Sequence, residues 1–309
     1  MIINTGQRTD IPAFYAEWFC NRLRAGFVLV RNPYDPQRVT RYRLTPDVVD
    51  LIGFCTKNPA PMLPHMELLR PFGQYWYVTI TPYGRDIEPR VPNKLQVLDS
   101  FRRLAEIVGP DSMGWRYDPI LISGDWPVER HIKAFDCMAR ALAGYTHTAV
   151  ISFIDLYEKT RRNFPEARPV SREDRLTLGK ALAEIARRNG MTLRPCAEGD
   201  ELDRFGADCG GCMTVAMYEQ ALRQRLRVPR HAPARKECAC YLGADIGAYN
   251  SCGHLCRYCY ANYDAATVQA NLRAHDPLSP FLLGHSQPGD QIHEAEQESW
   301  IDPQTVMEI

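Results

Sequence analysis

Three cysteines near the C-terminal end of the chain are the residues with the clearest chemistry. They lie at Cys252, Cys256 and Cys259 in the segment YNSCGHLCRYCYAN, and an aromatic residue, Tyr258, precedes the last of them. Three thiolates on one short loop can bind a single inorganic centre. In a four-iron cubane they leave one iron without a protein ligand, and chemistry could occur at that iron. A structural zinc ion normally needs a fourth ligand nearby, and a zinc or purely structural centre is the alternative.

A second group of cysteines precedes this triplet. Cys209 and Cys212 form a C-x2-C pair, Cys238 and Cys240 form a C-x-C pair, and Cys196 follows an expected strand. Two such pairs can hold zinc or an auxiliary iron–sulfur cluster, with Cys196 as a further ligand. The alternative is that some are free thiols or that one joins the first centre. Three isolated cysteines in apolar runs are expected in the core: Cys20, Cys55 and Cys137.

The composition limits the classes of function. The chain has 309 residues with 37 Lys+Arg and 37 Asp+Glu, so zero net charge gives no bulk attraction to nucleic acid. The N-terminus lacks the pattern of a signal peptide, and no apolar run is long enough to span a bilayer. Clustered cysteines in such a chain indicate metal ligands before disulfides. We therefore expect a cytoplasmic protein without a membrane partner.

A local basic run could still bind a nucleic-acid backbone or a phosphate, although a solvated surface is the favoured interpretation. It comprises Arg223, Arg225, Arg227, Arg230, Arg235 and Lys236.

Short apolar runs alternate with longer amphipathic ones. Six strands are expected around residues 2–3, 48–55, 75–81, 115–123, 148–154 and 191–193. Helices are expected at 12–23, 95–108 and 129–143, and in a longer stretch that Ser171 caps. Residues 27–30 and 39–44 predict a β-hairpin or an extended excursion. This alternation predicts an α/β fold with parallel strands, in the form of a partial, open (β/α)6 TIM-like barrel. An open Rossmann-like sheet is the alternative, but no G-x-G-x-x-G follows the first strand.

The chain divides into three parts by composition. Residues 1–195 are expected to form the barrel, and residues 196–265 a cysteine-rich, cluster-binding appendage packed on its mouth. Residues 266–309 are expected to form a tail or a strap, with Trp300 as a docking point.

Polar residues collect where the expected strands end, which is where parallel α/β folds carry their chemistry. Those at or just beyond the strand ends include Arg8, Asp10, Lys57, Asn58, Arg116, Asp118 and Glu198. His254, inside the triplet loop, is a candidate ligand or proton donor, and a loop-forming role is favoured. Three residues after the third strand are expected to be exposed turn residues: Asp86, Glu88 and Arg90.

The triplet spacing, with its aromatic residue, resembles the cluster signature of the radical S-adenosylmethionine (radical SAM) enzymes. Over residues 1 to about 265 the chain is identified as a member of a bacterial family known as domain of unknown function 1848, related to those enzymes. The motifs that carry this resemblance are RTDIP (8–12), LVRNP (29–33), TKNP (56–59), TPYG (81–84), RYDP (116–119) and DIG (245–247) through the triplet segment.

The resemblance implies a [4Fe-4S] cluster on Cys252, Cys256 and Cys259 that cleaves SAM reductively to a 5′-deoxyadenosyl radical, which takes hydrogen from an unidentified substrate. It implies a SAM-contacting role for Tyr258, Asn58 and Asp118, with Tyr258 near the adenine, and an ordinary core aromatic is the alternative for Tyr258. The residues then expected to face SAM or substrate are Arg8, Asp10, Lys57, Arg116 and Glu198. An electron donor such as a flavodoxin or a ferredoxin is the implied partner.

The chain departs from ordinary radical SAM enzymes in one respect. Their triplet follows the first strand of the barrel, whereas here it follows all six expected strands, which indicates a permuted arrangement. Two alternatives remain: a non-catalytic zinc or iron–sulfur protein that binds nucleic acid, and a radical SAM lyase that acts on DNA or modified nucleotides.

Overall fold

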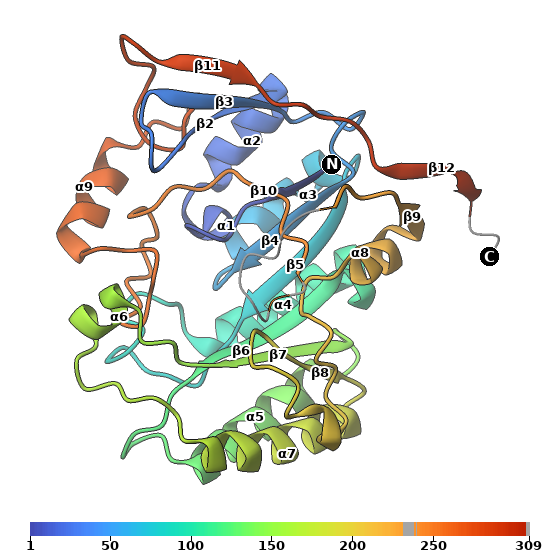
Figure 1. Ribbon diagram of the computed structural model, residues 1–309, viewed down its shortest axis with the longest axis vertical. Helices are drawn as coiled ribbons and strands as arrows, with labels where there is room; N and C mark the ends of the chain where they lie inside the picture. Colours follow the sequence, from blue (N-terminus) through green and yellow to red (C-terminus); the bar gives the residue numbers. More distant parts are fainter. Residues whose placement is uncertain (231–237, 239, 307–309) are drawn as a thin grey trace.

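The computed structural model describes residues 1–230, 238 and 240–306, and its central feature is a seven-stranded parallel sheet (Figure 1). The strand order is β10-β1-β4-β5-β6-β7-β8. The strands are β1 (Ile2–Asn4), β4 (Leu51–Thr56), β5 (Gly73–Thr79), β6 (Met113–Ile120), β7 (Thr148–Phe153), β8 (Thr192–Pro195) and β10 (Ala244–Asp245). The six predicted strands are confirmed. Within the described residues β10 and β8 do not pair with each other, so the sheet is open and no closed barrel forms.

The helices in the described residues include those expected at 95–108, at 129–143 and after Ser171, whereas the helix expected at 12–23 is divided into two helices at Tyr15. They are α1 (Ile11–Phe14), α2 (Ala16–Ala25), α3 (Met66–Leu69), α4 (Lys94–Val108), α5 (Val128–Leu142), α6 (Glu158–Asn163), α7 (Arg172–Arg188), α8 (Val215–Leu222) and α9 (Ala265–Ala274), with 3-10 turns at Ala60–His65, Pro110–Ser112 and Asp203–Phe205. Ser171 caps α7 by accepting a hydrogen bond from the amide of Asp174, as predicted. None of the helices in the described ranges is long and apolar enough to cross a membrane.

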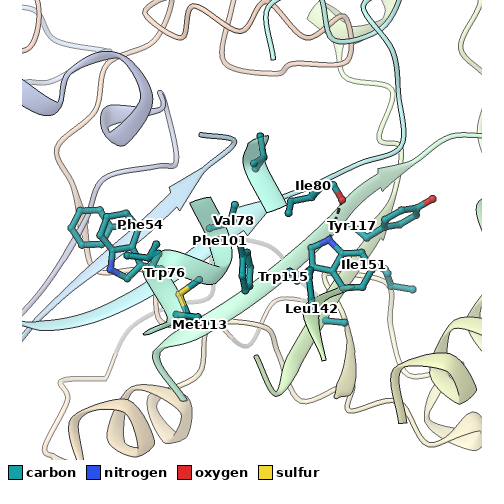
Figure 2. Close-up of a cluster of buried hydrophobic side chains, with 14 of the residues drawn as sticks. Phe54, Trp76, Val78, Ile80, Phe101, Met113, Trp115, Tyr117, Leu142 and Ile151 are labelled. Atoms are coloured by element: carbon teal, nitrogen blue, oxygen red, sulfur yellow. Dashed lines mark hydrogen bonds between the residues drawn. The ribbon is translucent and has the colours of Figure 1, made fainter. Parts of the chain in front are cut away.

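Successive side chains of β5 point to opposite faces of the sheet and pack in two different hydrophobic cores. On β5, Trp76 and Val78 belong to the large core that α2, α4, α5 and α7 cover. Figure 2 shows part of this core, where the indole nitrogen of Trp115 donates to the carbonyl of Ile80 at 3.0 Å. Tyr75 and Tyr77 point to the opposite face, where they pack with the cysteine-rich segment and α8. Both faces of the sheet are therefore covered.

The cysteine-rich segment contains more regular structure than the sequence indicated. Composition alone marked residues 196–265 as a cysteine-rich appendage, and α8, β9 (Gln224–Leu226) and β10 form there. Helix α8 begins where the hydroxyl of Thr214 accepts a hydrogen bond from the amide of Met217, and it buries Tyr218 on the sheet. Strand β10 has only two residues and shows no alternation that could predict it.

The C-terminal part of the chain returns to the N-terminal half (Figure 1). The predicted hairpin forms from β2 (Phe27–Arg31) and β3 (Arg38–Arg43), and β11 (Gln291–Glu294) adds to β3 in parallel. Strand β12 (Ile301–Val306) pairs with β9. Trp300 packs against Tyr241, and its amide donates to the carboxylate of Asp50 at 2.8 Å. Within its described residues, this C-terminal part therefore contacts β3, β9 and the side chain of Asp50.

Candidate functional site

The cysteine triplet follows strand β10 and lies at the edge of the sheet where the parallel strands end. Because β10 pairs with β1, the amide of Ile246 donates to Asn4 at 3.0 Å and leads the chain into the loop. Two hydrogen bonds close the base of the loop: the amide of Asn250 to the carbonyl of Ala261 at 3.1 Å, and the side chain of Asn262 to the carbonyl of Cys252 at 2.8 Å. These hydrogen bonds therefore close residues 250–262 into a ring.

A glycine inside the ring allows it to pack closely on helix α1. A Cβ added at Gly253 would lie 2.6 Å from the nearest ring carbon of Phe14, which real Cβ atoms do not tolerate. The ring of Phe14 also meets His254 edge to face, with 4.6 Å between the ring centres. These contacts fix the first half of the loop against the end of α1.

The three thiols lie in the interior and interact with one another. Cys256 is buried, and Cys252 and Cys259 are half-buried. Burial raises the pKa of all three thiols, that of Cys256 to about 12, with the neighbouring cysteines and Asp10 contributing to that of Cys252. Among the described residues, no three or more His, Cys, Asp or Glu side chains are arranged to hold a metal ion. The three thiols thus lie near one another, and a cofactor on them is a proposal.

Asp10 joins three segments at this edge of the sheet. One carboxylate oxygen caps α1 by accepting from the amide of Ala13 at 3.0 Å. The other accepts from the amide of Lys57 at 2.7 Å and lies 2.9 Å from Nε2 of His254. His254 is 2% exposed, so this contact anchors the triplet loop to the ends of β1 and β4. The favoured prediction, that His254 serves to form the loop, fits this contact.

Glu88 is the centre of a charged network that the sequence did not reveal. Its carboxylate accepts hydrogen bonds from Lys57 at 2.8 Å and from Thr81 at 2.6 Å, and also from Lys94 and Tyr258. The prediction that Glu88 is an exposed turn residue was wrong, because the residue is 1% exposed. Asp86 and Arg90 are exposed as expected.

The network around Glu88 contains more positive than negative charge. Burial alone would raise the pKa of Glu88, but the ammonium groups of Lys57 and Lys94 lower it to about 2. Two ammonium groups therefore face one carboxylate. Both also interact electrostatically with Cys256. An excess positive charge beside a thiol favours its thiolate form.

Tyr258 belongs to the same network. Its hydroxyl donates to Glu88, and the ammonium group of Lys57 lies 5.6 Å from the centre of its ring. Its ring also meets that of Tyr83 at 6.2 Å. The aromatic residue of the triplet is therefore held inward, towards the ends of β4 and β5.

Arg116 and Asp118 lie beside the second cysteine group. The guanidinium of Arg116 binds both carboxylate oxygens of Asp118, at 2.6 to 3.2 Å, and Nη1 lies 3.6 Å from the sulfur of Cys212. The sulfurs of Cys212 and Cys240 are 3.3 Å apart. Cys196 also interacts with the thiol of Cys212. Cys196 and Cys212 therefore lie near the guanidinium of Arg116, and Cys240 contacts Cys212.

The remaining cysteines separate into different surroundings. Cys209 packs with the large core instead of with Cys212, and Cys238 is half-buried on the side of Cys240. Cys55, expected in the core, is half-buried on the same face as the second group, a placement that its apolar run did not indicate. Cys20 is buried as predicted, but Cys137 is exposed on α5, so that prediction was wrong.

Three other predicted site residues have structural partners. Arg8 donates to the side chain and the backbone of Asp245, at 2.5 and 2.6 Å, and so joins the loop after β1 to β10. Asn58 forms a turn by accepting from the amide of Ala60 at 3.3 Å. Glu198 accepts from the amide of Phe153 at 2.8 Å, and burial raises its pKa to about 7. Arg8 and Glu198 thus lie at opposite ends of the sheet.

The basic run is described as far as Arg230, whereas Arg235 and Lys236 lie outside the described residues. Arg225 pairs with Glu219 at 3.2 Å, and Arg227 pairs with Asp302 at 2.8 Å. Both arginines therefore have carboxylate partners within the protein.

Comparison with known proteins gave one match. A family model described as Domain of unknown function (DUF1848) matches residues 2–261, which include the seven-stranded sheet, both cysteine groups and the charged network around Glu88. No curated protein and no solved structure matches the chain.

Proposed function

The chain belongs to the DUF1848 family, and from the arrangement of its cysteine loop we propose that it is a radical SAM enzyme. Cys252, Cys256 and Cys259 would bind a [4Fe-4S] cluster, and the open sheet would act as a partial barrel whose C-terminal edge holds SAM and substrate. When bound, this cofactor pair would supply reductive cleavage of SAM, in which one electron from a flavodoxin or ferredoxin would yield methionine and a 5′-deoxyadenosyl radical able to take a hydrogen atom from the substrate.

The observation that carries the proposal is the closed ring with three interacting thiols at the strand ends. Only three cysteines lie in this ring, and three thiolates leave one iron of a cubane open. The residues also fit the charge of such a group. Thiolate ligands make a cluster anionic, and Lys57 and Lys94 provide one positive charge more than Glu88 neutralises beside Cys256.

The surrounding residues would position the loop and exclude water. Asp10 and His254 fix the loop to the ends of β1 and β4. Glu88 holds the hydroxyl of Tyr258, so the ring of this tyrosine has a set orientation beside Cys256. Because each contact is already made by the protein, the loop needs little rearrangement to bind a cofactor.

Anaerobic reconstitution with iron and sulfide tests the proposal. We expect about four iron and four sulfide per chain, in line with a cubane, and 5′-deoxyadenosine after addition of SAM and dithionite. Cys256→Ala should lose the iron, whereas Cys137→Ala, which changes an exposed cysteine on α5, should retain it.

Two results would reject the proposal. Cys256→Ala with the iron content of the wild type would remove the triplet as the ligand set. Zinc without iron or sulfide, together with no 5′-deoxyadenosine, would favour the non-catalytic alternative.

A further inference from the structure

A cleft of about 710 Å³ lies beside the cysteine loop and is not part of the charged network around Glu88. Its walls come from residues 29–34 and 36 in β2 and the turn after it, 157–159 at the start of α6, 246–250 after β10, and 281–283. The LVRNP motif lies in the first of these walls, and the cysteine site makes no use of it. A cleft of this size can hold a small organic ligand.

Four tyrosines line the cleft: Tyr34, Tyr157, Tyr249 and Tyr260. Three of them are exposed, by 88% for Tyr34, 41% for Tyr157 and 45% for Tyr260. The rings of Tyr157 and Tyr260 lie 5.9 Å apart in a tilted arrangement. Exposed aromatic rings that gather in a concave site offer flat surfaces on which a planar ligand can stack.

Positive charge also faces the cleft. Arg8, Arg31 and Lys159 line it, together with a single carboxylate, that of Glu158. The acids that pair with Arg8 and Arg31 are Asp245 and Asp290, and neither lines the cleft. The ammonium group of Lys159 lies 4.9 Å from the centre of the Tyr249 ring and has no carboxylate partner among the described residues.

The arginines are held in place before any ligand arrives. Arg31 binds both oxygens of Asp290, at 2.5 and 2.9 Å, and its guanidinium lies 4.9 Å from the centre of the Phe281 ring. Arg8 is fixed on Asp245. Side chains that are already ordered lose little conformational entropy on binding, so the cleft is a prepared site.

We propose that this cleft binds a nucleotide, with the base against the tyrosines and the phosphate at Lys159. The apolar walls and aromatic rings suit a planar base, and the cationic side chains suit an anionic group. Tyr249 and Tyr260 flank the cysteine triplet, and Lys159 is close enough to Cys259 to interact with it electrostatically. The further assignment of this nucleotide as the substrate rests on the proposed function, whereas its binding does not.

Binding of the four ribonucleoside 5′-monophosphates to the full chain tests the proposal, with ribose 5-phosphate as the probe that lacks a base. We expect equilibrium dialysis to show at least one nucleotide that binds about tenfold or more tightly than ribose 5-phosphate. Tyr249→Ala should weaken this binding about tenfold or more, because a stacked base is lost. Lys159→Gln should weaken it about fivefold and reduce its salt dependence. Tyr145→Ala and Lys133→Gln, which lie outside the cleft, should leave it unchanged.

The same measurement on Cys256→Ala separates the two proposals. Unchanged nucleotide binding in this variant supports the cleft whether or not a cluster forms in the wild type. Equal affinities for nucleotide and ribose 5-phosphate would overturn the proposal, as would binding that neither Tyr249→Ala nor Lys159→Gln alters. A single-stranded 12-mer that binds more tightly than every monophosphate would replace the free nucleotide with a nucleic-acid strand.

Discussion

Replacing Glu88 with glutamine should destabilise the fold by about 3–5 kcal/mol, because it leaves two ammonium groups without a buried counter-charge. The side chain of Glu88 is fully buried, and those of Lys57 and Lys94 are only 13% and 24% exposed. Glutamine has nearly the same shape and keeps one acceptor oxygen, so the substitution removes charge with little change in packing. A buried ion pair that loses one partner is costly for this reason.

The pKa of Glu88 gives the same scale. Its ordinary value of 4.5 falls to about 2 in the folded protein. A difference of this size corresponds to about 3 kcal/mol of favourable interaction with the ionised carboxylate. This contribution is fully present above pH 4.5 and is lost as the pH falls towards 2, so a measurement at pH 7 captures all of it.

Urea unfolding at pH 7 and constant ionic strength, followed by circular dichroism, measures the effect. Glu67→Gln is the matched control, because Glu67 pairs with Arg70 at the surface with side chains 84% and 76% exposed, and it should change the free energy of unfolding by about 0.5 kcal/mol or less. Lys94→Met leaves Lys57 and Glu88 as a one-to-one pair and should cost less than half as much as Glu88→Gln. In the Glu88→Gln background the same lysine substitution should restore stability, since one unpaired ammonium group disappears.

Two results would refute this reasoning. A loss below about 1 kcal/mol for Glu88→Gln would mean that water or ions reach the carboxylate, contrary to its burial. Strict additivity of Glu88→Gln and Lys94→Met would mean that the two charges do not interact, contrary to their hydrogen bond.

Three further predictions concern other parts of the structure. Burial lowers the pKa of His131 to about 4, so the protein should lose about 2 kcal/mol of stability between pH 7 and pH 5, because the unfolded state binds a proton there and the folded state does not. Urea unfolding at both pH values should show a smaller loss for His131→Gln than for the wild type. An equal loss in the two proteins would contradict the assignment of the effect to His131. Gly253→Ala should destabilise the protein by about 1–3 kcal/mol because its Cβ meets the ring of Phe14, whereas Gly124→Ala, where a Cβ meets nothing within 4 Å, should have little effect in the same assay. Oxidation with diamide should form a disulfide between Cys212 and Cys240, whose sulfurs are 3.3 Å apart. Peptide mass spectrometry identifies the bond, and a Cys209–Cys212 disulfide instead would show that the sulfurs are placed differently.

The fold could be predicted where burial leaves a pattern along the chain. On β5 the residues Trp76 and Val78 enter one core while Tyr75 and Tyr77 enter the other, so the strand appears as one apolar, aromatic run. Ser171 predicts the start of helix α7, and Asn189-Gly190 predicts its end. These signals are local, and the sequence displays them without knowledge of the fold.

The candidate site could be predicted only in part, because its partners are distant in the sequence. The spacing of the triplet is a local signal, but the hydrogen bond between Asp10 and His254 joins residues 244 positions apart. Glu88 lies among polar turn residues, and nothing near it in the sequence distinguishes it from Asp86, which is exposed. The difference arises because Lys57, Lys94 and Tyr258 converge on Glu88 from three other segments.

The strand order also explains how a triplet at the C-terminal end of the chain can lie beside its first strand. Strand β10 pairs with β1, so the loop that follows β10 and the loop that follows β1 leave the same edge of the sheet side by side. This adjacency lets Arg8 bind Asp245 and lets Asp10 reach His254. Because the pairing depends on two residues, Ala244 and Asp245, the sequence carries no periodic signal for it. The triplet therefore lies beside the first strand although about 240 residues separate them, because the loop after β10 follows the strand that pairs with β1.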